Sequence, residues 1–285
     1  MTKKSSISYP SSAPFGGDNG AIWLAAVVGL SLSFAALFLI QKQLEAHKLL
    51  DFEWVAHNRI RALNHGLDNS LLAVTTLHDH VVASGGVETA GFEVFARALL
   101  DRYQGLESLM WVSQGLGKEQ AAPTPEHHVV RATHSGIGPD FDLFGDARFT
   151  ETLARARRQG RITASGRIAY PLPGGGTAYG FMVATPVFES PVSVTGKNRV
   201  DGFVVGFFRL GDLANDAISL LEPRGVEILI LDKSAPADER FLHFYASRLV
   251  TGFVDESNYS AWWDDPAQPK VAERVQVADR QLAIV

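Results

Sequence analysis

The chain of 285 residues contains no cysteine, which excludes disulfide bonds, metal sites with cysteine ligands and thiol nucleophiles. It also lacks a strong charge imbalance, because its formal net charge is only -5. No basic stripe with interleaved aromatic residues occurs, so we expect no nucleic-acid partner. With 46% hydrophobic and 20% charged residues, the composition is typical of a globular protein with one large core or two smaller ones.

The motifs of common enzymes are missing as well. Neither GxSxG nor HExxH occurs, and no acidic pair stands in a recognisable active-site context. Two groups of histidines resemble metal ligands at first sight: His78 with His80, and His127 and His128 with His134. Neither group has the spacing of a metal site, so we interpret both as solvated. We therefore expect no enzyme, no metal and no cofactor in this chain.

Charged residues are absent from one long apolar run near the N-terminus. Residues 1–20 are rich in Ser, Gly and Pro, which predicts a disordered cytoplasmic tail. Residues 21–41 follow as AIWLAAVVGLSLSFAALFLIQ, and about 20 helical residues span about 30 Å, the hydrocarbon thickness of a bilayer. A cleavable signal peptide is the alternative, but the following QKQLEAHK offers no small-x-small cleavage site. We expect an uncleaved transmembrane helix over residues 21–41.

Lysines flank this run on both sides and do not decide its orientation. Lys3 and Lys4 precede it, and Lys42 and Lys48 follow it, so the count for the positive-inside rule is nearly balanced. A short tail that stays inside while a large domain is exported is the ordinary arrangement for such an anchor. We therefore expect a single-pass protein of the cell inner membrane, with its domain in the periplasm or outside the cell.

Residues 42–84 contain no proline and a single glycine, Gly66. Apolar residues recur there at steps of three and four, which predicts a long amphipathic stalk helix that ends before Gly85. The helix can pack on its own domain or on a second copy, and the spacing does not decide between them. The stripe consists of Leu49, Phe52, Ala56, Ile60, Leu63, Leu67, Leu71, Val74, Leu77 and Val81.

The remaining chain alternates short helices with β-prone runs, a pattern typical of an α+β fold with two sheet regions. Asp146 is the expected N-cap of a helix that ends at Gly160, and Arg155, Arg157 and Arg158 are expected to complement its dipole. The glycines at 174–176 lack a following GK with Ser or Thr, so we expect a hairpin turn rather than a phosphate loop. The expected strands cover residues 106–112, 127–133, 161–172, 178–188, 202–208, 226–231, 241–246 and 271–285.

The stretch from Phe141 to Ala164, FDLFGDARFTETLARARRQGRITA, begins with an aspartate among bulky apolar residues. A carboxylate at Asp142 would lose hydration there and stay charged only with donors that replace the water. A ligand with N–H groups could supply those donors. In the alternative interpretation, Asp142 is a turn residue bonded to nearby backbone amides.

The same run, followed by GFMVATPVF and GFVVGFFRLGDL, resembles a CHASE domain, the extracellular sensory module of sensor histidine kinases, nucleotide cyclases and cyclic-di-GMP enzymes. The resemblance extends from the stalk to about Leu221. It implies a stalk helix that carries two PAS-like subdomains in tandem, here residues 85–195 distal to the membrane and 196–285 proximal to it. It also implies a homodimer, a ligand in the distal subdomain and a second transmembrane helix before a cytoplasmic output domain.

The resemblance also implies a ligand site. Asp142 is similar to the aspartate that hydrogen-bonds the ligand's ring nitrogens in the plant cytokinin receptors, and Thr163 falls at a strand position whose backbone contacts that ligand. The implied pocket walls are Tyr170, Phe181, Val183 and Phe203. Where the receptors are rich in leucine, this chain has Ile162-Thr163-Ala164, so the expected ligand is a purine-like or other small organic molecule.

No kinase, cyclase or phosphodiesterase motif occurs before Val285. The resemblance therefore implies either the N-terminal part of a histidine kinase or a diguanylate cyclase or phosphodiesterase, or a gene product that has lost its output domain. The alternative function is that of a membrane-anchored periplasmic scaffold that binds a partner and no small molecule. A cavity next to Asp142 would favour the sensor, and a space filled with side chains would favour the scaffold.

Overall fold

The computed structural model describes residues 19–113, 129–133, 145–172, 176–188, 200–219, 221, 225–247, 254–264 and 269–285. The chain divides into two compact units, Met1–Asp51 and Phe52–Val285. The second unit contains both sheets and all the described residues that we consider for a site.

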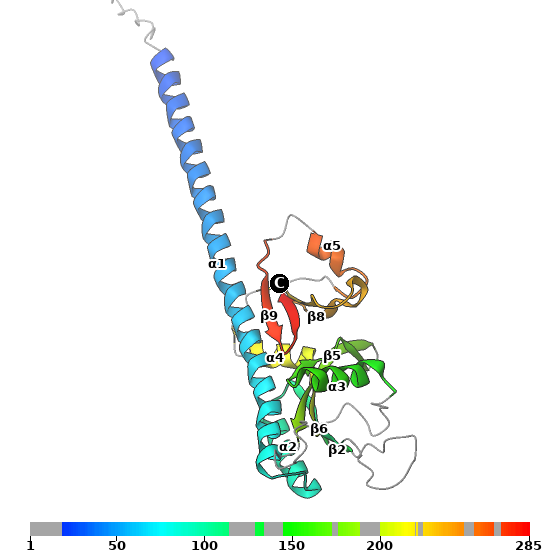
Figure 1. Ribbon diagram of the computed structural model, residues 1–285. Helices are drawn as coiled ribbons and strands as arrows, with labels where there is room; N and C mark the ends of the chain where they lie inside the picture. The colour runs from blue at the N-terminus through cyan, green and yellow to red at the C-terminus, as the bar shows by residue number, and fades with distance from the viewer. Residues whose placement is uncertain are drawn as a thin grey trace, which may run out of the picture. The chain divides into compact units, whose positions relative to one another are not determined.

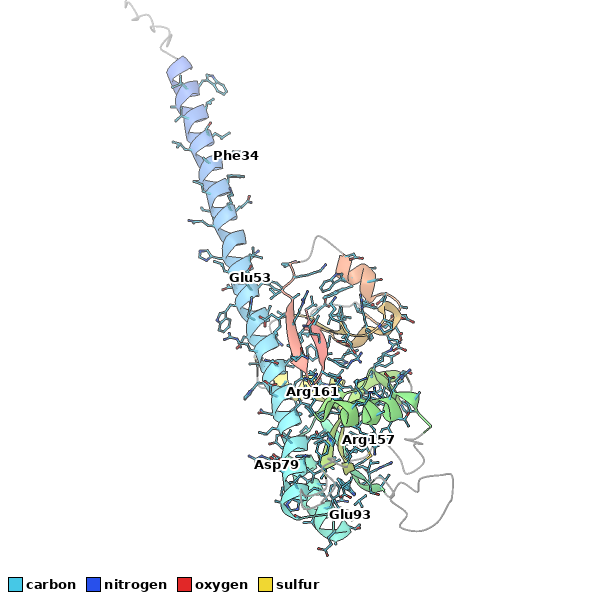
Figure 2. The ribbon with its side chains drawn as sticks, in the orientation of Figure 1. Phe34, Glu53, Asp79, Glu93, Arg157 and Arg161 are labelled. Atoms are coloured by element: carbon cyan, nitrogen blue, oxygen red, sulfur yellow. The ribbon has the colours of Figure 1, made fainter. Side chains whose placement is uncertain are left out.

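The first unit consists, where it is described, of the beginning of helix α1, which extends from Asn19 to Ala83. This part of the helix is long and apolar enough to cross a membrane, by length and composition. Its large side chains are exposed, among them Trp23 and Phe34, which projects from the ribbon in Figure 2. An apolar surrounding would remove this surface from water at a gain of about 25 cal/mol per Å². The region predicted as a membrane span is therefore helical and apolar on all sides.

In the second unit, α1 packs against its own domain through the predicted stripe. The stripe is buried from Ala56 to Val81, apart from the half-buried Leu71. Leu63, Leu67 and Leu77 are among the largest fully buried side chains. The helix ends at Ala83, and the next glycines, Gly85 and Gly86, both have positive φ. The glycines therefore stop the helix where the sequence predicts, because they adopt left-handed backbone at little cost.

The first sheet has six antiparallel strands in the order β2-β1-β6-β5-β3, with β4 paired to β5 (Figure 1). Helices α1 and α2 cover one face of it and α3 covers the other, since the two faces belong to separate apolar clusters. The elements are α2 (Thr89–Arg102), β1 (Leu106–Ser113), β2 (Val129–Thr133), α3 (Ala147–Gln159), β3 (Thr163–Ala164), β4 (Ile168–Pro171), β5 (Thr177–Phe188), β6 (Val200–Arg209) and α4 (Leu210–Ser219).

The pairing of β6 extends the first sheet past the expected subdomain boundary. The sequence places that boundary between residues 195 and 196, which would give β6 to the second subdomain. Instead, β6 pairs with β5 and with β1 and lies inside the first sheet. The change of sheet comes after α4, because the next strand begins only at Ile228. The strands that flank the expected turn, β4 and β5, pair antiparallel, whereas residues 173–175 lie outside the described residues.

The second sheet has four antiparallel strands in the order β8-β7-β10-β9. One face shares the core with α1 through residues such as Ile230 and Leu282, and the other packs near Trp262 and Trp263. The elements are β7 (Ile228–Asp232), a short 3₁₀ helix η1 (Ala237–Glu239), β8 (Phe241–Tyr245), α5 (Tyr259–Asp264), β9 (Glu273–Val277) and β10 (Arg280–Ile284). The α+β fold with a long N-terminal helix and two sheets is as predicted.

Candidate functional site

Helix α3 begins and ends through the local contacts that the sequence predicts. The backbone N–H of Arg148 donates to Oδ1 of Asp146 at 2.8 Å, which caps the helix. Gly160 has a φ of 65° and closes the other end. Asp142 itself, with the segment 134–144, lies outside the described residues.

Three of the predicted ligand residues share the face of the first sheet that α3 covers. The Thr163 hydroxyl on β3 donates to the carbonyl of Thr152 in α3, at 3.2 Å. Tyr170 on β4 meets the ring of Phe207 edge-on, with centroids 6.1 Å apart. Phe203 on β6 is only 1% exposed and belongs to the same apolar cluster as α3.

Phe181 and Val183 lie on the opposite face. Both belong to the apolar cluster that includes α1 and α2, and the ring of Phe181 stacks on Phe208 with centroids 5.1 Å apart. Side chains alternate across a strand, so β5 cannot present these two residues to the face that holds Tyr170. The structure therefore brings together Thr163, Tyr170 and Phe203 but not Phe181 and Val183.

The Tyr170 ring lies next to a cluster of charged side chains at the edge of the sheet. The Arg209 guanidinium lies 5.2 Å from the centre of the Tyr170 ring and bridges Glu107 at 3.2 Å and Asp212 at 2.9 Å. Burial raises the pKa of Tyr170, and a hydrogen bond with Arg209 opposes this shift. The phenol is therefore neutral at physiological pH, and the ring serves as an aromatic wall beside a compensated guanidinium.

A cavity of about 610 Å³ opens beside Tyr170, between the first sheet, α4, strand β8 and the segment 254–257. This junction cavity was not predicted from the sequence, because its walls come from segments far apart in the chain. Only Tyr170 among its described lining residues was a predicted ligand contact. The aromatic and ionisable lining residues are Tyr170, Tyr179, Phe241, Phe244, Asp212, Asp255, Glu256 and His243.

Two contacts at the rim of the junction cavity tie Arg167 and Tyr179 to the segment 254–257. The Arg167 guanidinium lies 4.6 Å from the centre of the Tyr179 ring and bonds Glu256 at 2.5 Å. The Tyr179 hydroxyl donates to the other oxygen of Glu256, also at 2.5 Å. The hydrogen bond from Arg167 is the main cause of the lowered pKa of Glu256, so this carboxylate stays ionised.

Asp279, in the turn between β9 and β10, fastens the second sheet to α3. Its carboxylate accepts from Nε of Arg155 at 2.8 Å and from the backbone N–H of Ala164 at 2.8 Å. Arg155 also donates to the carbonyl of Ala164. Arg155 thus does more than complement the helix dipole, whereas Arg157 and Arg161 are exposed. The distant partner has no local signal in the sequence.

The histidines near the end of α1 do not converge on a metal site. His78 contacts the adjacent Asp79 at 3.0 Å, and His80 stacks on Phe95 with centroids 4.3 Å apart. Within the described ranges, no group of three or more His, Asp or Glu residues could hold a metal ion. His127, His128 and His134 lie outside those ranges.

Residues 134–243 match the family described as the CHASE domain, which confirms the resemblance drawn from the sequence. All six predicted ligand residues fall within this range. No curated protein matches the chain.

The fold is similar to that of a solved periplasmic sensory domain. The periplasmic sensory domain of the Campylobacter jejuni chemoreceptor Tlp1 has a TM-score of 0.51 and 10% identity, over 81% of this chain and 90% of that one. An extracellular ligand binding receptor from Desulfohalobium retbaense has a TM-score of 0.49 and 12% identity, over 82% of this chain. The match spans only 39% of that receptor. At such low identity the likeness to Tlp1 supports the fold alone, with antiparallel PAS-like sheets behind a long helix.

Proposed function

This chain carries a CHASE domain, an extracellular sensor module of signalling proteins, and from this premise we propose that it binds a small organic ligand outside the cell inner membrane. The proposed ligand is a purine-like or other small organic molecule. The proposed output domain is a histidine kinase, or a diguanylate cyclase or phosphodiesterase. We further propose that the chain acts as a homodimer and that the membrane helix anchors it.

The observation that carries this proposal is the position of the predicted residues under α3. The family match includes Asp142, and α3 begins only a few residues after it, at Ala147. Thr163, Tyr170 and Phe203 lie on the face of the sheet that α3 covers. We propose that the Asp142 carboxylate accepts hydrogen bonds from ligand N–H groups beside this face, with Tyr170 as a neutral aromatic wall.

A ligand at this face would act through α3. The helix is bonded to Asp279 in the second sheet through Arg155, so a shift of α3 would carry the β9–β10 hairpin with it. Such a ligand changes the equilibrium only if it binds one arrangement more tightly than the other.

A thermal-shift screen of purines and other small organic compounds on the full chain in detergent micelles tests the ligand site. A compound that binds should raise the melting temperature of the wild type and lose most of that effect on Asp142→Ala. Asp140→Ala is the matched control, because it removes the same group two residues away. Equal stabilisation of Asp142→Ala and wild type would refute the site, and no stabilising compound at all would favour the scaffold alternative.

A further inference from the structure

The junction cavity has the size and walls of a ligand site, and only Tyr170 and Ala178 of its described lining belong to the apolar cluster under α3. Its volume of about 610 Å³ lies in the ordinary range for small-molecule sites. Gly211, Asp212 and Asn215 of α4 line it, together with β8 and the segment 254–257. Tyr170 is the only predicted ligand residue among its described walls. The inference therefore goes beyond the proposed function.

The charge around this cavity is negative. Asp212, Asp255 and Glu256 line it, and no lysine or arginine belongs to the described lining. Arg209 bonds Asp212, and Arg167 bonds Glu256, whereas Asp255 accepts from the uncharged backbone N–H and hydroxyl of Ser257. The carboxylates that line the cavity therefore outnumber these two guanidinium groups by one, and a concave site of one sign attracts ligands of the other sign.

The aromatic walls suit a cation as well. A cation over the face of a tyrosine or phenylalanine ring is attracted by the ring quadrupole. Both tyrosines already hold a guanidinium in this way, with Arg209 at 5.2 Å from Tyr170 and Arg167 at 4.6 Å from Tyr179. Phe241 and Phe244 add apolar surface from β8. Each tyrosine ring therefore already carries a guanidinium on one face, and the two phenylalanines supply the apolar part of the wall.

His243 supplies a hydrogen-bonding atom that its own chain does not use. Its Nε2 is buried and has no hydrogen-bond partner among the described residues. Burial lowers the pKa of His243 to about 4, so the ring is neutral at physiological pH, and a ligand reaches the lone pair of the covered Nε2 only when neighbouring side chains move. An ammonium group has three N–H donors and no acceptor, which complements this nitrogen and the nearby carboxylates.

We propose that the junction cavity is a second ligand site, which takes a small organic cation that joins a primary ammonium group to an apolar or aromatic body. The ammonium group lies near Asp212 and His243, and the apolar body lies against Tyr170, Tyr179 and Phe241.

Isothermal titration of the full chain in detergent micelles at neutral pH tests this site with three probes of similar shape. These are 2-phenylethylamine, which is cationic, 2-phenylethanol, which is neutral, and 3-phenylpropanoate, which is anionic. The amine should bind about tenfold tighter than the alcohol, because hydrogen bonds to charged groups are stronger than neutral ones. The anion should bind weakest. Equal affinity of the amine and the alcohol would overturn the proposal.

Two aspartates on α4 give a matched pair of variants. Asp212→Asn should weaken amine binding about tenfold and leave alcohol binding nearly unchanged. Asp216→Asn removes the same charge one turn later, outside the described lining of the cavity, and should leave both affinities unchanged. Equal losses in the two variants would show a general charge effect and refute a specific site.

Asp212→Asn also removes the ion pair with Arg209 and can unfold the protein. A third variant tests the site without breaking this pair. Asn215 is an exposed lining residue, so Asn215→Lys should fold and should repel the amine. Unchanged amine affinity in Asn215→Lys would contradict the proposal. Asp142→Ala should bind the amine as the wild type does, which separates this site from the one proposed under α3.

Discussion

His243 is a buried imidazole whose protonation opposes folding. Burial lowers its pKa from the usual 6.5 to about 4 in the folded chain, so below pH 6.5 the unfolded state binds more protons than the folded state. The stabilising effect of a neutral His243 is therefore fully present above pH 6.5 and is lost as the pH falls towards 4. The whole loss is worth about 3 kcal/mol, since one pKa unit corresponds to about 1.4 kcal/mol.

We expect urea unfolding of the full chain to show this loss between pH 7 and 4.5, and His243→Phe to show a flatter profile. Asp212, Asp255 and Glu256 also line the cavity. Because the pKa values of Asp255 and Glu256 are lowered, protonation of these carboxylates destabilises the fold only at a more acidic pH than this range. Parallel pH profiles of His243→Phe and wild type would show that His243 does not carry the effect.

Sequence reasoning succeeded at the residue scale where the contact is local. Asp146 caps α3 through the N–H two residues on, and Gly160 ends the same helix, so both positions are readable from neighbouring residues. It did not find the partner of Arg155, because Asp279 is 124 residues away. It also placed Phe181 and Val183 with Tyr170, because the face of each side chain depends on the pairing register of β5.

At the scale of elements, α1 meets the first sheet through a glycine. A Cβ on Gly206 of β6 would lie 2.6 Å from Cγ2 of Val74 in α1, so no larger residue fits there without movement. Gly206→Ala should destabilise the chain by roughly 1–3 kcal/mol, the usual range for overpacking in a filled core. The urea midpoint of the full chain measures this loss.

Two further variants separate crowding from the general effect of replacing a glycine. Val74→Ala in the Gly206→Ala background should recover part of the loss, because it removes the methyl groups that the new Cβ meets. A Cβ on Gly91 of α2 would meet only the Glu88 side chain, at an ordinary contact distance of 3.9 Å, so Gly91→Ala should stabilise the helix by roughly 0.5–1 kcal/mol. A Gly206→Ala variant as stable as the wild type would mean that α1 and β6 are not tightly packed.

The order of elements was predictable because it depends on periodicity. The steps of three and four in α1 and the apolar runs of β5 and β6 identify one long helix and two strands that are covered on both faces. The boundary between the sheets was not predictable, since β6 joins the first sheet by pairing with β1, about 90 residues earlier in the chain. The junction cavity was missed for the same reason.

At the scale of the whole second unit, Asp279 is the contact most directly placed to couple the two sheets. Its side chain is only 11% exposed and bonds both Arg155 and the backbone of Ala164. Asp279→Ala leaves a half-buried guanidinium and a backbone N–H without this partner, which should cost roughly 1–3 kcal/mol. It should also speed amide hydrogen exchange in the β9–β10 hairpin and at β3 more than in β1 or β2.

Glu151→Ala is the control for Asp279→Ala, because Glu151 contacts the same arginine from an exposed position. Glu151 lies 3.8 Å from Arg155 with a side chain that is 71% exposed, and such surface pairs contribute at most about 1 kcal/mol. Its loss should therefore leave hydrogen exchange at β9–β10 unchanged. If both variants loosen the hairpin equally, Arg155 acts through its charge alone, and the Asp279 carboxylate is not a specific link between α3 and the second sheet.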